Sequence, residues 1–121
     1  MWIIAKYKKK ELNIFLDEFK KKMKSPTKIY QPKIKLNSKS KNNSFKYILG
    51  NYIFLWNDNF KNSNMIESLK FTKGVEYFLR KPEHSQSEII EFINNCKNHE
   101  DLKGFLKPSF FMSIIKDRAK F

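Results

Sequence analysis

A row of three aromatic side chains alternates with aliphatic ones near the middle of the chain. Tyr52, Phe54 and Trp56 occupy every second position, with Ile53 and Leu55 between them. Successive side chains of an extended chain point to opposite faces, so the three aromatics share one face. Such a row is suited either to core packing or to docking against a partner. A segment that is apolar on both faces indicates a central strand with layers on either side.

The residues that could do catalytic chemistry form no recognisable set. His84 and His99 lie in separate polar segments with no second histidine at ligand spacing, and Cys96 lies three residues before His99. One Cys–His pair is a poor metal site, because zinc in proteins takes three or four protein ligands. The sequence has no glycine-rich phosphate loop, serine elbow or spaced carboxylate set. We therefore expect no enzymatic activity, no metal site and no cofactor.

The charge balance points to a polyanionic partner. The 121-residue chain carries a formal net charge of +13, and only Arg80 and Arg118 among its 25 basic residues are arginine. Lysine meets phosphate as a point charge and rarely reads bases through paired hydrogen bonds. The composition therefore favours contacts with a nucleic-acid backbone over a base-reading code. An AT-rich genome would produce the same bias toward Lys, Asn, Ile and Phe, so charge alone does not decide.

Simple features of the sequence bear on localisation. No apolar run is long enough to span a bilayer, and the run at 2–5 is too short for a signal-peptide core. The single cysteine, Cys96, cannot form an internal disulfide, which fits a reducing cytoplasm. We expect a cytoplasmic monomer with no membrane association.

The spacing of apolar residues predicts the elements that position these side chains. Strands are expected at 2–7, 29–36, 45–56 and 75–79, and helices at 10–24, 59–70 and 86–97. The two middle strands form a hairpin around a polar loop at 37–44. This order predicts an α+β fold, a single α/β sandwich of about four mainly antiparallel strands with three flanking helices. It fills residues 1–97, and residues 98–121 are expected to be a linker or short helical tail.

The element order and several motifs resemble the N-terminal domain of the NusG family of transcription elongation factors. Trp2-Ile3-Ile4-Ala5 resembles the opening Trp-Tyr strand of the family, and Leu49-Gly50-Asn51-Tyr52-Ile53-Phe54 resembles its Phe-Pro-Gly/Asn-Tyr-Val/Leu-Phe strand. Thr72-Lys73-Gly74-Val75, with Phe78 and Arg80, resembles its Gly-Val strand, closest to the specialised RfaH-like branch. Ser87-Glu88-Ile89 resembles the start of the last helix.

The resemblance covers about residues 2 to 97 and has clear departures. Ile3 replaces the usual Tyr, and Gly50 stands where the family usually has Pro. The C-terminal KOW module of the family, a small β-barrel with a glycine-rich signature, is absent from this chain. The role of that module in contacting ribosomal protein or a termination factor is therefore not carried over.

The resemblance implies a transcription elongation or antitermination factor that binds RNA polymerase. In NusG relatives an apolar patch of this domain grips the coiled-coil clamp helices of the largest polymerase subunit. Carried over by motif, that patch comprises the following residues: Tyr52, Phe54 and Phe78, with Lys6 and Tyr7 at its border. The second polymerase contact of the family, a His-Thr-Thr-like motif, would align near Met65-Ile66-Glu67, which does not match it.

RfaH-like relatives also touch the non-template DNA strand, and this implies a second set of contacts. The matching positions are Lys8, Lys21 and the pair Thr72-Lys73. Binding to single-stranded DNA is expected to be weak and salt-sensitive. The alternative is a generic basic module for single-stranded nucleic acid, in which aromatic rings stack on bases and lysines hold phosphates.

Overall fold

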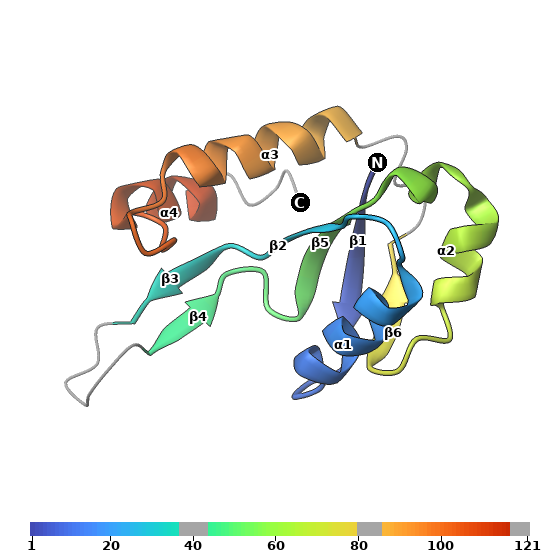
Figure 1. Ribbon diagram of the computed structural model, residues 1–121. Helices are drawn as coiled ribbons and strands as arrows, with labels where there is room; N and C mark the ends of the chain where they lie inside the picture. The colour runs from blue at the N-terminus through green and yellow to red at the C-terminus, as the bar shows by residue number, and fades with distance from the viewer. Residues whose placement is uncertain (37–43, 80–85, 117–121) are drawn as a thin grey trace. The chain divides into compact units, whose positions relative to one another are not determined.

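The computed structural model describes residues 1–36, 44–79 and 86–116 (Figure 1). All but the last residue of the expected polar loop at 37–44 lies outside this part, as do Arg80, His84 and the final residues of the expected tail. The elements group into two compact units. The sheet unit comprises Met1–Gln31 and Asn51–Ile90, and the hairpin unit comprises Pro32–Gly50 and Glu91–Phe121.

The sheet unit is built on a four-stranded antiparallel sheet in the order β2-β5-β1-β6. Its strands are β1 (Trp2–Tyr7), β2 (Lys28–Tyr30), β5 (Tyr52–Trp56) and β6 (Val75–Phe78). The predicted α+β class and the mainly antiparallel sheet are confirmed. β5 lies between two other strands, as expected for a segment that is apolar on both faces.

Two helical segments of this unit begin where an asparagine side chain satisfies an exposed backbone N–H group. The predicted helix at 10–24 is α1 (Leu12–Lys22), and the one at 59–70 is a short 3₁₀ turn, η1 (Asp58–Lys61), followed by α2 (Ser63–Leu69). Each of the latter two starts with an asparagine whose side-chain oxygen accepts the N–H two residues on. Asn57 accepts from Asn59 at 2.8 Å and Asn62 from Asn64 at 2.9 Å. Because Asn62 caps a second helical segment, the single helix predicted at 59–70 is divided into η1 and α2.

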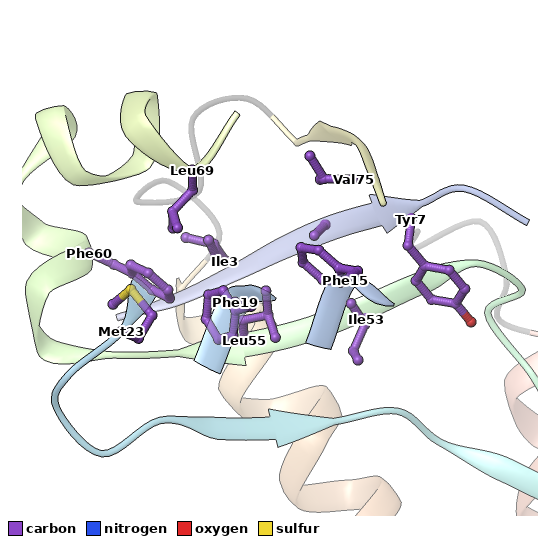
Figure 2. Packing of buried hydrophobic residues seen from close by; sticks show 11 residues of the cluster. Ile3, Tyr7, Phe15, Phe19, Met23, Ile53, Leu55, Phe60, Leu69 and Val75 are labelled. Atoms are coloured by element: carbon purple, nitrogen blue, oxygen red, sulfur yellow. The ribbon is translucent and has the colours of Figure 1, made fainter. Parts of the chain in front are cut away.

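One face of the sheet is buried under α1, η1 and α2 (Figure 2). Phe15 and Phe19 lie one turn apart on α1, and their ring centroids are 5.9 Å from each other. Phe19 also meets Phe60 of η1 at 6.2 Å. The remaining members of this core are Ile3, Ala5, Tyr7, Met23, Ile53, Leu55, Leu69 and Val75. Offset aromatic contacts of this kind add to the stability that apolar burial provides.

Asn57 is a buried polar residue at the junction of three segments. Its side-chain amide donates to Ser25 Oγ at 2.9 Å and to the Pro26 carbonyl at 3.2 Å. Its backbone carbonyl accepts a hydrogen bond from the N-terminal ammonium of Met1 at 3.3 Å. Burial lowers the pKa of that ammonium from its usual value. Asn57 thus ties the chain start, the 25–26 turn and η1 together.

Replacing Asn57 with alanine is expected to destabilise the fold by about 1–3 kcal/mol, because buried donors and acceptors lose their partners. Asn62→Ala is the matched control, since it removes a cap of the same geometry from an exposed position. It should cost about 0.5–1 kcal/mol. Urea unfolding followed by circular dichroism measures both changes. Equal losses of unfolding free energy would contradict the role of Asn57 in connecting the three segments.

The hairpin unit contains the antiparallel strands β3 (Lys33–Lys35) and β4 (Phe45–Tyr47) and the helix α4 (Pro108–Lys116). The predicted helix at 86–97 is α3 (Gln86–Asn98), which begins in the sheet unit and continues into this one. Residues 91–97 group with the expected tail rather than with the preceding sheet. No helix in the described part of the chain is long and apolar enough to cross a membrane.

The strands predicted at 29–36 and 45–56 are each interrupted. β2 and β3 are separated by Gln31 and Pro32, and Pro32 lacks the N–H that a continuous ladder needs. β4 and β5 are separated by the turn at 48–51, where Gly50 adopts a left-handed φ of 64°. The strand predicted at 45–56 therefore starts pairing in the main sheet only at Tyr52, and Tyr47 belongs to the smaller sheet.

Candidate functional site

The aromatic row of β5 lies on the sheet face opposite the α1 core. Ile53 and Leu55 belong to that core, so the alternating Tyr52, Phe54 and Trp56 face away from it. On the neighbouring strand β1, Lys6 is directly opposite Tyr52. At the other end of the row, the ammonium of Lys28 lies 4.8 Å from the centre of the Trp56 ring. The predicted division of β5 into two faces is confirmed.

Tyr52, Lys6 and Tyr77 form a compact group across three strands, hereafter the tyrosine–lysine cluster. The two tyrosine hydroxyls are 2.7 Å apart, and their rings meet edge to face at a centroid distance of 6.4 Å. Lys6 Nζ lies 5.7 Å and 5.6 Å from the two ring centres and 3.5 Å from Glu76 Oε2. The hydrogen bond with Tyr52 raises the pKa of the Tyr77 phenol above its usual value. The cluster is therefore an ordered, partly exposed surface of mixed polar and aromatic character.

A β-bulge in β6 places Tyr77 in this cluster. Tyr7 pairs with Val75, but the register then shifts, so that Lys6 pairs with Tyr77 and Ala5 with Phe78. The shift leaves Glu76 as the extra, unpaired residue of the bulge. The side chains that follow it therefore point to the opposite faces from those that regular alternation would give. As a result Phe78 packs against the α1 core, and Tyr77 lies beside Lys6. Simple alternation within Val75–Phe78 gives no signal of this reversal, so Tyr77 was missed.

The other three residues of the expected polymerase patch, Phe54, Phe78 and Tyr7, lie outside the tyrosine–lysine cluster. Phe54 is only 1% exposed and stacks on Tyr30 with ring centroids 6.5 Å apart. Tyr7 is buried in the α1 core, where its hydroxyl accepts a hydrogen bond from Gln31 at 2.7 Å. Adjacent residues of a strand point to opposite faces, so Lys6 and Tyr7 do not border one surface. Of the five expected residues, Tyr52 and Lys6 share the partly exposed face.

The segments that carry the expected DNA contacts lie together around α1. The N–H of Lys8, just before the helix, donates to the Gly74 carbonyl at 2.8 Å. At the other end of the helix, Lys22 Nζ donates to Thr72 Oγ1 at 3.2 Å. Gly74 allows this close approach, because an added Cβ would lie 2.9 Å from Phe15 Cβ and its φ is 88°. The turn before β6 therefore lies alongside α1. The expected DNA contacts need this proximity, because they come from both segments.

Three of the four residues expected to contact DNA are exposed lysines. Lys8, Lys21 and Lys73 are all exposed, and Lys21 forms a long surface ion pair with Glu18, at 3.8 Å. Thr72 differs from them, because it is 3% exposed and its hydroxyl receives Lys22. A phosphate would have to displace that contact and reach a buried atom. The three lysines, hereafter the α1 lysines, are the exposed part of the expected DNA site.

The Cys96 and His99 side chains, three residues apart in the sequence, lie in different surroundings. The thiol of Cys96 is buried. The His99 ring stacks on Phe110 at a centroid distance of 4.2 Å, and its Nδ1 lies 2.8 Å from the Asn95 carbonyl oxygen. Residues 1–36, 44–79 and 86–116 contain no group of three or more His, Cys, Asp or Glu side chains placed to hold a metal ion.

No protein-family model matches the chain, and a search of curated proteins gives no significant match. The resemblance to the NusG family therefore rests on the motifs and on the order of the elements alone.

Proposed function

We propose that this protein is a NusG-type transcription elongation or antitermination factor that docks on the clamp helices of RNA polymerase through its tyrosine–lysine cluster. The observation that carries the proposal is the position of this cluster. Tyr52 and Lys6, two residues of the motif-derived patch, meet on the partly exposed face of two central strands. In the antiparallel sheet the first strand, β1, lies beside the last, β6, which brings Tyr77 next to Lys6.

The chemistry of the cluster fits a helical protein partner. Tyrosine is enriched at protein interfaces because its ring supplies apolar area while its hydroxyl keeps a hydrogen-bond partner. Tyr52 and Tyr77 are held by each other, by Lys6 and by the strands that carry them, so little ordering is needed on binding. Lys6 and Glu76 offer opposite charges at the edge of the rings, suited to charged side chains on a coiled coil.

Binding to the isolated clamp helices tests the proposal. The expected result is a saturable, one-to-one complex by isothermal titration calorimetry, formed in the absence of nucleic acid. The alternative function, a generic module for single-stranded nucleic acid, predicts no heat with these helices. Absence of a complex at concentrations of about 100 μM, near the weak end of specific binding, would overturn the proposal.

The proposal includes a weak backbone contact of the α1 lysines with the non-template DNA strand. Lys8, Lys21 and Lys73 are exposed on segments that hydrogen bonds hold together. Each phosphate neutralised on a single strand lowers the logarithm of affinity by about 0.7 per tenfold rise in salt. These contacts carry no sequence information by themselves.

Replacing Lys8, Lys21 and Lys73 together with alanine is expected to flatten the salt dependence of single-stranded DNA binding by about two log units per decade. Fluorescence anisotropy over a range of salt concentrations measures the slope. The control removes the same charge from exposed lysines elsewhere, Lys61, Lys97 and Lys107. If both triple variants change the slope equally, the α1 lysines form no particular DNA site.

A further inference from the structure

The small sheet of the hairpin unit carries lysines and aromatic rings on one face. Its register places Lys33 opposite Tyr47 and Lys35 opposite Phe45, with Ile34 opposite Lys46 between them. Residues directly opposite each other share a face, and the face alternates along each strand. Two lysines and two aromatic residues therefore lie on one side of β3 and β4.

Phe105 extends this face from a loop fixed beside β3. The N–H of Leu106 donates to the Lys33 carbonyl at 2.9 Å, which holds the loop against the strand. The Asp101 carboxylate accepts the N–H groups of Lys103 and Phe105 at 2.8 Å and 3.0 Å. The bond from Phe105, followed by that from Lys103, lowers the pKa of Asp101. The Asp101 carboxylate therefore stabilises the loop that carries the Phe105 ring.

Lys33 and the two phenylalanine rings are in direct contact. Lys33 Nζ lies 5.1 Å from the centre of the Phe45 ring and 5.0 Å from that of Phe105. The two rings are 6.3 Å apart, and Phe45 also meets Tyr47 edge to face at 5.1 Å. A single cation therefore lies next to a series of three rings. Phe45 remains 42% exposed within it, and Lys35 is exposed beside it.

We propose that this face, formed by Lys33, Lys35, Phe45, Tyr47 and Phe105, binds single-stranded nucleic acid by stacking bases on its rings while its lysines hold the backbone phosphates. Proteins that bind single strands combine aromatic rings, on which bases stack, with positively charged residues that follow the backbone. A purely apolar partner would leave the lysines without counter-charges, and duplex nucleic acid hides its base faces. Single strands supply both the bases and the phosphates. The inference is independent of the proposed polymerase contact, because it concerns different residues and a different partner.

The decisive comparison uses strands that have phosphates but no bases. Labelled single strands of about 12 nucleotides, within the usual site size, would be oligothymidylate, oligouridylate and an abasic strand of equal length. The unaltered chain should bind the two base-containing strands at least about 5-fold more tightly than the abasic one, measured by fluorescence anisotropy. A preference between thymidylate and uridylate would identify DNA or RNA as the better ligand. Equal binding of all three strands would overturn the inference, because charge alone would then account for it.

Phe45→Ala is expected to abolish the preference for base-containing strands and leave the salt dependence unchanged. Phe45→Trp, which keeps a stacking surface, should retain the preference. Leu102→Ala is the matched control, because it truncates a fully exposed apolar side chain in the same unit. Wild-type behaviour of Phe45→Ala would also overturn the inference. Clamp-helix binding should be unaffected by Phe45→Ala, so failure of this inference and failure of the proposed function are separable.

Discussion

Replacing both Tyr52 and Tyr77 with alanine is expected to weaken binding to the polymerase clamp helices by at least about 30-fold, or about 2 kcal/mol. The two rings hold each other and Lys6, so their joint loss removes the aromatic surface and the ordering of the cation between them. Truncation of central aromatic anchors commonly has effects of this size. Isothermal titration calorimetry with the isolated helices measures the change.

The control for this double variant is Phe71→Ala. Phe71 is 87% exposed and lies in the same unit, in the turn that precedes β6, so its truncation also removes an exposed ring. It should bind the helices like the unaltered chain. Tyr77→Phe separates the two features of the cluster, because it keeps the ring and removes one hydroxyl from the 2.7 Å contact. Equal losses for the double variant and Phe71→Ala would contradict a docking role for the cluster.

Phe15→Ala is expected to destabilise the protein by about 3–5 kcal/mol. Phe15 is fully buried between α1 and the sheet, and Gly74 approaches its Cβ closely, so the surroundings have little room to collapse into the space. That loss is a large share of the total stability of a small domain, about 5–15 kcal/mol. Urea unfolding followed by circular dichroism measures it.

Ile14→Ala is the matched control for Phe15→Ala. It lies next to Phe15 on the same helix but is exposed, so its truncation should change stability by less than about 1 kcal/mol. If Phe15→Ala does not fold, Phe15→Leu keeps part of the side-chain volume and should still unfold cooperatively, at lower urea than the wild type. A Phe15→Leu protein as stable as Ile14→Ala would contradict the role assigned to this ring.

The regular elements were predictable because their apolar periods are simple. Phe15, Phe19 and Met23 recur at helical spacing and fill the core, and Ile53 and Leu55 alternate with the aromatic row. Features that depend on a single backbone irregularity were not predictable from periodicity. Pro32 and the turn around Gly50 divide each long hairpin arm into two strands that belong to different sheets.

The candidate site was predicted less completely than the fold. Motif matching identified Tyr52 and Lys6, which the structure brings together, but it also selected Phe54 and Tyr7, which are buried. Tyr77 was overlooked because a bulge, decided by pairing with β1, reverses the faces of β6. The face that contains Phe105 depends on a contact between residues far apart in the sequence, Leu106 and Lys33, which no local pattern indicates.

Site-specific photo-cross-linking tests the central claim most directly. A photoreactive benzoylphenylalanine would be placed at position 77 in one preparation and at position 71 in another, and each protein would be irradiated with RNA polymerase. If the protein docks through the tyrosine–lysine cluster, position 77 should cross-link to the clamp helices of the largest subunit and position 71 should not. Mass spectrometry identifies the cross-linked peptides. Cross-links absent at position 77, or the same from both positions, would contradict docking through this cluster.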